Sequence, residues 1–588
     1  MTTHDRTDHA HRPLTSSPGV WDAEVADADA AIRADAAARA GGMSRRAFLA
    51  GAAAALPAAA VLGTGLAAAG SRRTPPRASG ASFGYGPSAA CKLPPAVLAR
   101  FRNGWDPKRS ADVVYAPHGW NYLSGAISHS TPWHYTQDVP MVWYGPGVIR
   151  AAGNKGRYVT SADIAPTIAK LLNFPFHAPD GTPMSEALTG TKPTLVVVLV
   201  WDAGGKYVLN LHPGTTPHLT HLKNVGTFFA NATVGSNPSN TAPIHATIGT
   251  GAHPAKHGIV DNTIRFPDGH LGDPWSQGPG ILKMPSLADE YAKAMGSKAR
   301  TAMFGTLPWH LGMVGQGANL PGGVKHIAVL REQGNGSTSA PGWALPSRLA
   351  SFYRFPAYVN DPSVCHPLSY FTRQWADLLS DSVVDGRWRG HSIQAAQGGF
   401  HTPARVPYQT EAIEKVIAHE HLGQHEETDL LFLNYKIIDE IGHEYFADSP
   451  EMGDTIRVQD QFLQNLVSFL ENRFHGKYAL CVTADHGHTA HPSRTGGVPL
   501  LTDRIHSLLE ARFDADGDGV TLAQNVRPTG VLLNRHEIQQ NHTRLYNMAK
   551  YLSQQTVGDL GTQISGPPGA PAFDAVFSGS ILPSLDCS

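Results

Sequence analysis

The chain has almost no excess of charge of either sign, because its 47 lysine and arginine residues are balanced by 48 aspartate and glutamate residues. Charged residues make up only 16% of the sequence, against a typical ~25%. A nucleic-acid-binding protein is expected to show a basic excess, and a disordered chain combines low hydrophobicity with high net charge. With 41% hydrophobic residues, the chain is predicted to fold and not to bind nucleic acid.

Cysteine is also scarce, with four residues in the whole sequence, and none of them lies in a thiolate metal motif. Cys481 lies inside the apolar run YALCVTA, which predicts a buried free thiol. Cys91 and Cys587 lie near the two ends of the predicted mature protein. We expect one disulfide between them, although four cysteines allow three pairings.

Glycine, proline and histidine are abundant, at 60, 44 and 30 residues in a chain of 588. This length allows several domains, or one large α/β domain with insertions. The glycine and proline content indicates a loop-rich enzyme. Since imidazole is the commonest metal ligand and a frequent general base, the histidine content favours a metal or acid/base site.

Residues 43–69 carry a twin arginine, Arg45 and Arg46, followed by an Ala-rich apolar run that ends in three alanines. This stretch resembles a Tat export signal, which implies a protein located outside the cell or in the cell envelope. Glycines and a proline interrupt the run, so we expect cleavage and no permanent membrane span. Residues 1–42 are predicted to be a disordered leader, and the Pro/Gly/Ser-rich residues 70–90 a linker.

Three short apolar runs, each followed by acidic, His or Gly residues, dominate the rest of the chain: 194–205, 429–443 and 477–488. Such runs are typical of fully buried parallel strands, and helical patterns at 285–296 and 456–474 lie between or beside them. The sequence therefore predicts an α/β protein, a three-layer sandwich with a mostly parallel central sheet. Ligands of such sheets bind outside the carboxyl ends of the strands, where Asp202, Asp439 and Asp485 fall.

Two of these acids are paired with histidine. Asp439 and His443 are four residues apart, so on a helix they share one face, and Asp485 is followed directly by His486. A helix cap or a hydrogen-bonded loop histidine would explain either pair alone. Together with Asp202 they indicate a catalytic site for Zn²⁺, or for Mn²⁺ and similar ions, because carboxylates and imidazoles suit these metals.

The order of these motifs resembles the alkaline phosphatase superfamily, specifically its type I phosphodiesterase/nucleotide pyrophosphatase branch. The resemblance covers about residues 194–495 and includes a T-x-P-x-H element that begins at Thr241 and an H-G-I-V-D-N stretch that ends at Asn262. It implies two divalent metals, Thr241 as nucleophile and metal ligand, and Asn262 as an amide that holds a phosphoryl oxygen. A bound metal would lower the pKa of the threonine hydroxyl, and a phospho-threonine would then be hydrolysed. An N-cap role for Thr241 is the structural alternative.

The family takes its sixth protein ligand from a histidine near its carboxyl end, and this chain has no matching context there. The context appears upstream, in HSTPWHYTQDVPMVWYGPG at 129–147 and the stretch that follows it. We infer a circular permutation, with residues 91–190 as the displaced carboxyl-terminal segment and His129 as the ligand. Residues 112–190 should then pack into the same sheet as the runs at 194–205 and 477–488. Residues 191–588 would form the main catalytic domain, with a cap insertion at about 330–428. His134 and His491 are the alternatives to His129.

The resemblance also bears on the substrate, a small-molecule phosphoester. The monoesterase branch carries a Lys-x-Arg pair before G-A-x-L-P, and here Val314 and Gln316 occupy those positions, which favours diesters. Lys325 and Arg331 lie nearby in sequence and are candidate substitutes. A sulfatase is excluded because its C/S-x-P-x-R motif is incomplete. A phosphomonoesterase, a phosphonate hydrolase and a non-catalytic binding protein of the same fold remain as alternatives.

Residues 514–525 resemble the first half of a calcium loop, with Asp514, Asp516 and Asp518 at the expected offsets. Asn525 stands where a bidentate Glu belongs. A tight solvated turn and a weak structural calcium site are both consistent with this pattern. The sequence makes no prediction of the oligomeric state.

Overall fold

The structure, a computed structural model, describes residues 84–124, 129–331, 342–379, 385–393, 401–562 and 567–587. All of these residues belong to one compact unit, Ser71–Ser588. The predicted leader at 1–42 and the predicted export signal at 43–69 lie outside the described residues. Among the helices of the described part, none is long and apolar enough to cross a membrane.

The centre of the molecule is a nine-stranded sheet in the order β11-β10-β9-β14-β5-β15-β3-β6-β4. Its central strands are the three predicted apolar runs, which pair in parallel and are buried along their whole length. Only β3 among the described strands of this sheet runs antiparallel to its two neighbours. The strands are β3 (Met141–Tyr144), β4 (Gly153–Thr160), β5 (Leu195–Trp201), β6 (Thr227–Thr233), β9 (Thr301–Phe304), β10 (His326–Val329), β11 (Tyr353–Arg354), β14 (Asp429–Tyr435) and β15 (Tyr478–Thr483).

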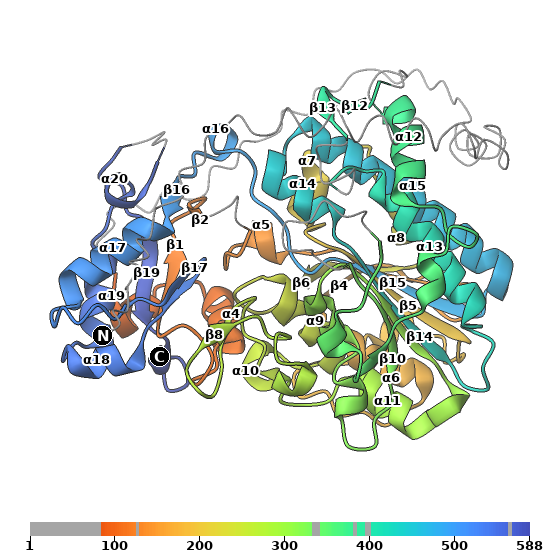
Figure 1. Cartoon of the computed structure of the whole chain (residues 1–588), viewed down its shortest axis with the longest axis horizontal. Helices are drawn as coiled ribbons and strands as arrows, with labels where there is room; N and C mark the ends of the chain where they lie inside the picture. The colour runs from red at the N-terminus through yellow and green to blue at the C-terminus, as the bar shows by residue number, and fades with distance from the viewer. Residues whose placement is uncertain are drawn as a thin grey trace, which may run out of the picture. The chain divides into compact units, whose positions relative to one another are not determined.

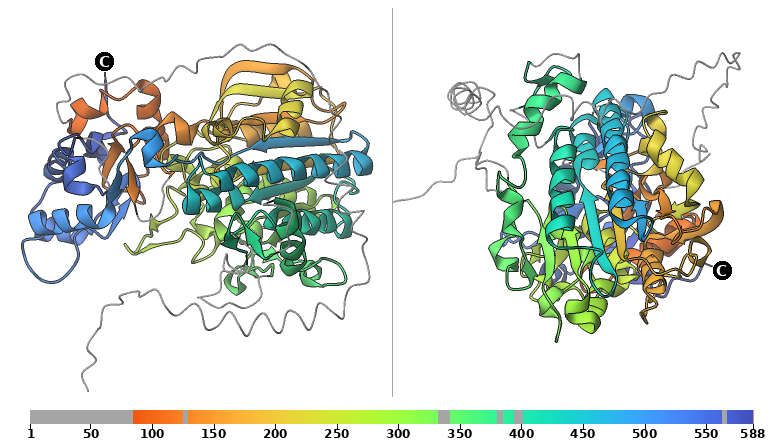
Figure 2. Two further views of the ribbon diagram at one scale, coloured as in Figure 1. Left: turned by 90° about the horizontal axis from the view of Figure 1, so that it is seen from above. Right: turned by 90° about the vertical axis from the view of Figure 1, so that its right-hand side faces the viewer.

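Helices cover both faces of this sheet (Figure 2). Side chains of β5 alternate between the two faces: Val196 and Val198 pack into one core cluster, and Val197 and Leu199 pack into the other. One face is covered by α6 (Ile164–Leu172), α9 (Thr241–Thr250) and α11 (Leu287–Met295), and the other by α13 (Arg405–His419), α14 (Ile437–Tyr445) and α15 (Pro450–Phe474). The predicted three-layer α/β sandwich is confirmed.

A second, four-stranded antiparallel sheet lies beside the sandwich (Figure 1). It combines β1 (Val113–Pro117) with three strands from the end of the chain: β17 (Asn525–Arg527), β18 (Gly530–Leu532) and β19 (Phe573–Ser578). We refer to it as the small sheet. β2 (Tyr122–Ser124) likewise pairs with β16 (Pro499–Leu501).

Our expectation that all of residues 112–190 join the central sheet is therefore wrong for their first part. β1 and β2 pair with carboxyl-terminal strands, whereas β3 and β4 lie in the central sheet. The apolar residues of β1 explain this, because Val113 and Tyr115 pack into a separate core cluster formed with residues 498–576.

Two predicted boundaries also differ from the structure. The end of the predicted linker forms α3 (Gly86–Ala90), whose Ala89 and Ala90 pack against β19 residues in a small core cluster. The predicted cap at 330–428 contributes β11 to the central sheet and α13 to its helical layer. Apolar residues buried along α13 make it part of the sandwich, so the insertion is shorter than expected.

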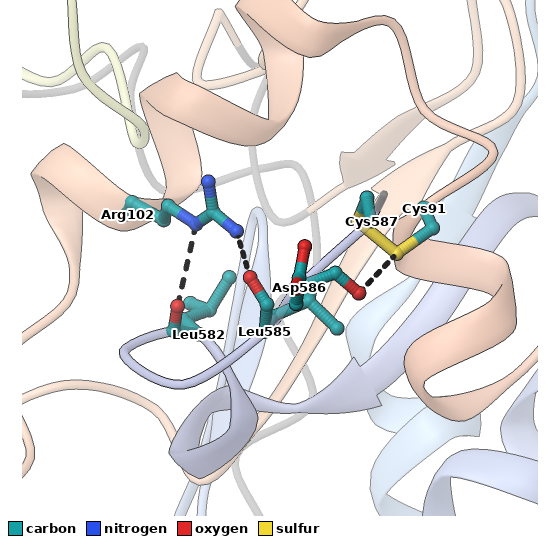
Figure 3. The surroundings of a disulfide bond; sticks show 6 residues. All are labelled: Cys91, Arg102, Leu582, Leu585, Asp586 and Cys587. Atoms are coloured by element: carbon teal, nitrogen blue, oxygen red, sulfur yellow. Dashed lines mark hydrogen bonds between the residues drawn. A yellow bond between two sulfur atoms is a disulfide. The ribbon is translucent and has the colours of Figure 1, made fainter.

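Cys91 and Cys587 form a disulfide, as expected, with their Cα atoms 5.3 Å apart. Beside it, Arg102 of α4 (Pro95–Gly104) donates hydrogen bonds to the carbonyls of Leu582 and Leu585 (Figure 3). The bond therefore joins the two ends of the described chain next to the small sheet. Cys481 is a free buried thiol, which confirms that prediction.

We expect Cys91→Ser/Cys587→Ser to lower the free energy of unfolding by about 2–5 kcal/mol, because a disulfide that closes a long loop restricts the unfolded chain. Thermal unfolding with and without a thiol reductant measures this. The reductant should destabilise the parent protein and leave the double variant unchanged. An equally stable double variant would contradict the prediction.

Candidate metal centre

The three predicted acids lie together at the carboxyl ends of the central strands. Asp202 directly follows β5, Asp439 lies in the first turn of α14 just after β14, and Asp485 follows β15. All three side chains are buried. Because β14, β5 and β15 are parallel neighbours, their ends lie at the same edge of the sheet.

One group of potential ligands consists of Asp202, Asp485 and His486, whose ligand atoms lie within 4.8 Å of one another. His486 Nε2 lies 3.3 Å from Asp485 Oδ2 and 3.6 Å from Asp202 Oδ1. Two carboxylates and one imidazole that converge in this way form a three-ligand site suitable for a catalytic divalent metal.

The second group consists of His129, Asp439 and His443, also within 4.8 Å of one another. His129 Nε2 lies 3.4 Å from Asp439 Oδ1, and His443 Nε2 lies 3.4 Å from Asp439 Oδ2. α14 places Asp439 and His443 on one face, as predicted from their spacing. The rings of His129 and His486 stack with centroids 3.8 Å apart, so the two groups adjoin each other.

The two alternative histidines lie elsewhere. His134 is exposed at the start of α5 (His134–Gln137), and exposed His491 caps α16 (Pro492–Thr495) by accepting a hydrogen bond from the amide of Ser493. Neither belongs to a metal-ligating group in the described part of the chain. Of the three candidates, the structure brings only His129 to Asp439.

Hydrogen bonds fix the orientation of the imidazole rings in the two groups. His129 Nδ1 faces the carbonyl of Ser239 at 3.3 Å, and His486 Nδ1 faces the carbonyl of Gly487 at 3.0 Å. A carbonyl accepts only, so each Nδ1 carries the proton and each Nε2 keeps its lone pair. This tautomer is the one that binds a metal through Nε2.

Several buried polar atoms at the site have no hydrogen-bond partner among the residues that the structure describes: Asp439 Oδ1, Asp485 Oδ2, His486 Nε2 and His488 Nε2. Buried polar atoms without a partner are rare because they are costly. The lone pairs of Asp439, Asp485 and His486, which belong to the two ligand groups, match the donors that a divalent metal requires. The residues present therefore fit such an ion.

Thr241 is the first residue of α9, and its side chain is buried. Asn240, not Thr241, is the N-cap residue, so the N-cap explanation of Thr241 is wrong. Asn262 Oδ1 accepts a hydrogen bond of 2.9 Å from the amide of Ala242, the second residue of the helix. This bond identifies the oxygen of the Asn262 amide and leaves its NH₂ group as the donor for another ligand.

Lys436 is a central residue of the site that the sequence analysis missed. Its Nζ donates to Asp202 Oδ1 at 2.9 Å and to Thr241 Oγ1 at 3.2 Å, and lies 2.6 Å from Asp439 Oδ2. The same ammonium therefore contacts one carboxylate of each ligand group and the threonine hydroxyl. Lys436 lies in the apolar run NYKIID, between a strand and a helix, and belongs to no sequence motif that would have identified it.

The second carboxylate oxygen of Asp202, Oδ2, also has polar neighbours. Asn434 Nδ2 donates to Asp202 Oδ2 at 2.9 Å, and His310 Nε2 lies 3.4 Å from the same oxygen. His245 Nε2 accepts a hydrogen bond from the same Asn434 amide group. His245 Nδ1 donates a hydrogen bond to the carbonyl of Thr241. Asp202, His245 and His310 form a third group of ligand type, but these hydrogen bonds make His245 a support for the site. Its place in T-x-P-x-H was the only sequence signal for it.

Electrostatics favours the charge states that a metal requires at Asp202 and His486, but not at Asp485. Burial alone would raise the pKa of Asp202, but the Lys436 ammonium holds it below its usual range. Burial lowers the pKa of His486, and it lowers the pKa of His488 to about 3. Burial and the Asp202 carboxylate raise the pKa of Asp485. Neutral imidazole is thereby favoured at His486 and His488, and the raised pKa of Asp485 indicates that its ionised form needs additional positive charge nearby.

The type I phosphodiesterase/nucleotide pyrophosphatase family matches residues 196–574, well over half of the chain. The chain belongs to this family. This family lies within the alkaline phosphatase superfamily, and the chain's homologues are phosphoester hydrolases. The family is metal-dependent, in agreement with the ligand groups at the sheet edge.

Individual relatives are distant. Alkaline phosphatase PhoV of Synechococcus elongatus is 25% identical over 52% of this chain and 60% of its own length. Alkaline phosphatase PafA is 18% identical, with a TM-score of 0.45 over 61% of this chain and 76% of PafA. Phosphonoacetate hydrolase of Sinorhizobium meliloti 1021 is 17% identical, with a TM-score of 0.32 over 57% of this chain and 65% of the hydrolase. The chain thus spans about three fifths of the curated relatives it matches.

The positions that carry cations in the family's monoesterase branch hold none here. Val314 is buried, and Gln316 donates to the carbonyl of Leu282. Lys325 donates to the carbonyl of Ala350. Burial and the nearby Arg405 lower the pKa of Arg331 to about 10.

The predicted calcium ligands only partly come together. Asp514 and Asp516 form a group of ligand type with Glu537 of α18 (Arg535–Gln540), and Asp518 is not part of it. Asn541 Nδ2 donates to Asp516 Oδ2 at 3.1 Å and supports the turn. The three-acid group and this hydrogen bond are consistent with a tight turn and with a weak structural calcium site alike.

We expect His129→Ala to lower metal content by roughly one ion per chain, because a catalytic zinc usually has three protein ligands and the variant leaves two. His134→Ala is the matched control and should retain the parent content. Elemental analysis of the purified proteins, with circular dichroism to check the fold, measures this. Equal metal content in the two variants would rule out His129 as a ligand.

Proposed function

We propose that the protein is a secreted, two-metal phosphodiesterase that acts through a phospho-threonine on Thr241. The observation that carries the proposal is the set of contacts of Lys436, whose Nζ reaches Thr241 Oγ1, Asp202 Oδ1 and Asp439 Oδ2. These contacts support a position of the nucleophile between the two ligand groups. Family membership supports the reaction class.

The metals would be held by His129, Asp439 and His443 in one group and by Asp202, Asp485 and His486 in the other. Zinc is the expected ion. Two divalent ions held there would supply positive charge to the phosphoryl oxygens and would lower the pKa of the attacking hydroxyl.

The chain's own residues supply the remaining steps. Thr241 loses its hydroxyl proton to solvent and its Oγ1 attacks phosphorus, while the bond to the leaving oxygen breaks and that oxygen takes up a proton. Water then cleaves the phosphorus–Oγ1 bond, which releases the phosphate monoester and regenerates the hydroxyl. Asn262 donates its NH₂ group to a phosphoryl oxygen. Lys436 stabilises negative charge on Thr241 Oγ1, since an ammonium that donates to an oxygen favours its charged form. The amino-terminal end of α9 points at the same anion.

Diesters are the proposed substrates because Val314 and Gln316 replace the cations that would bind a terminal phosphate. The position of Lys436 favours the second candidate, a phosphomonoesterase or phosphonate hydrolase. It places one positive charge inside the site, where an additional phosphoryl charge would be attracted. The relatives PhoV and PafA, both described as alkaline phosphatases, agree with this alternative.

We further infer that the chain is circularly permuted. The inference is supported by β3 between β15 and β6, and by the contact of His129 with Asp439 across the chain. Export through a Tat signal remains a proposal from the sequence, and it suits a protein that folds around metal ions before it crosses the membrane.

Thr241→Ala should reduce kcat at least a thousand-fold, which corresponds to about 4 kcal/mol of barrier. Thr241→Ser is the matched control, because it keeps a hydroxyl at the same place and should retain measurable turnover. Trapping with radiolabelled substrate should label Thr241 in the parent only. Turnover of Thr241→Ala within ten-fold of the parent would show that another group attacks phosphorus.

Bis(p-nitrophenyl) phosphate should be hydrolysed with a kcat/KM at least about ten-fold above that of p-nitrophenyl phosphate, since kcat/KM reports differential transition-state binding. Lys436→Met keeps the length of the side chain and removes its charge. Faster hydrolysis of the monoester by the parent, lost selectively in Lys436→Met, would replace the diesterase proposal with the second candidate.

A further inference from the structure

One buried carboxylate, that of Asp261, forms hydrogen bonds with the segments on either side of the candidate nucleophile, Thr241. Its Oδ1 accepts hydrogen bonds of 2.6 Å from Asn240 Nδ2 and 2.6 Å from the amide of Asn262. Asn240 immediately precedes Thr241, and Asn262 bonds the amino-terminal turn of the same helix. Asp261 therefore ties together the two segments that flank the Thr241 hydroxyl.

Asp261 is itself held by a residue from the end of the chain. Arg527 of β17 donates from Nη2 to Asp261 Oδ1 at 2.8 Å and from Nε to Asp261 Oδ2 at 3.0 Å. This two-point contact fixes the plane of the carboxylate as well as its distance. Arg527 is braced in turn, because its carbonyl accepts a hydrogen bond from the Tyr115 hydroxyl of β1.

The network extends to the segment that carries His129. Ser130 Oγ donates to Asn240 Oδ1, so both ends of the Asn240 amide are engaged. His129 lies next in sequence, and its ring bonds the carbonyl of Ser239. Ser130 stands where the resembling family stretch has glycine, which has no hydroxyl to make this contact. Ser130 and Asp261 thus meet at Asn240, and Arg527 joins them through Asp261.

We infer that Arg527 is a positioning residue: through Asp261 it sets the distance and orientation of Asn240 and Asn262 around Thr241. This inference rests on the proposed roles of Thr241 and Asn262. The small sheet, which supplies Arg527, thereby takes part in the reaction without touching the substrate. A positional error of about 1 Å at reacting atoms costs on the order of a hundred-fold in rate, so loss of this contact has a measurable effect.

Arg527→Ala should lower kcat ten- to a hundred-fold and leave KM and metal content within about two-fold of the parent, since substrate and metal ligands stay in place. Bis(p-nitrophenyl) phosphate with added Zn²⁺ is the assay. Arg354→Ala is the matched control, because Arg354 makes a similar two-point contact with Glu420 at the far edge of the central sheet. It should lose comparable stability and keep its kcat.

Chemical rescue separates positioning from general destabilisation. A cavity of about 30 Å³ borders Arg527, Asp261 and Asn237, and truncation of Arg527 enlarges it. Millimolar guanidinium should therefore restore several-fold of the kcat lost in Arg527→Ala, and Arg527→Lys should retain part of it. Asp261→Asn, which loses the carboxylate, should be impaired and not rescued. Equimolar NaCl is the salt control.

Three results would overturn the inference: a kcat of Arg527→Ala equal to that of Arg354→Ala, a loss confined to KM, or recovery with NaCl as complete as with guanidinium. Failure of the proposed function has a different signature. If Thr241→Ala remains active while Arg527→Ala is impaired and rescued, the network exists and the nucleophile has been misassigned.

Discussion

Three buried carboxylates at one edge of a sheet require a compensating positive charge, and this constraint shapes the whole site. Asp202, Asp439 and Asp485 lie close enough that their mutual repulsion in a poorly solvated interior is large. The ammonium group of Lys436 provides part of this positive charge. The lone pairs that remain without a hydrogen bond, on Asp439, Asp485 and His486, are those that a divalent cation would occupy.

The sequence was informative wherever a local pattern determines the structure. Continuous apolar runs predicted β5, β14 and β15, and the four-residue spacing of Asp439 and His443 predicted a shared helical face. The chemistry of these residues at strand ends predicted where the site lies. His129 required a different kind of argument, because its motif had to be recognised in an unexpected place along the chain.

Residues that act through long-range contacts were not predictable in this way. Lys436 lies in an apolar run that reads as a strand, and only the fold turns its side chain toward Asp202. His310 and Asn434 orient Asp202 from separate elements and belong to no motif. The assignment of residues 113–124 failed for a related reason: a short apolar strand can complete either of two sheets, and its choice depends on partners about four hundred residues away.

The disulfide has a consequence for the chain's topology. With Cys91 bonded to Cys587, the backbone between them becomes a closed covalent ring, and all of the candidate site residues lie on it. In such a ring the order of the segments no longer depends on where the chain begins. A single backbone cut in an exposed loop would leave one connected molecule with new ends. Cys91 and Cys587, the two ends of this ring, lie side by side, which is the arrangement that tolerance of a circular permutation requires.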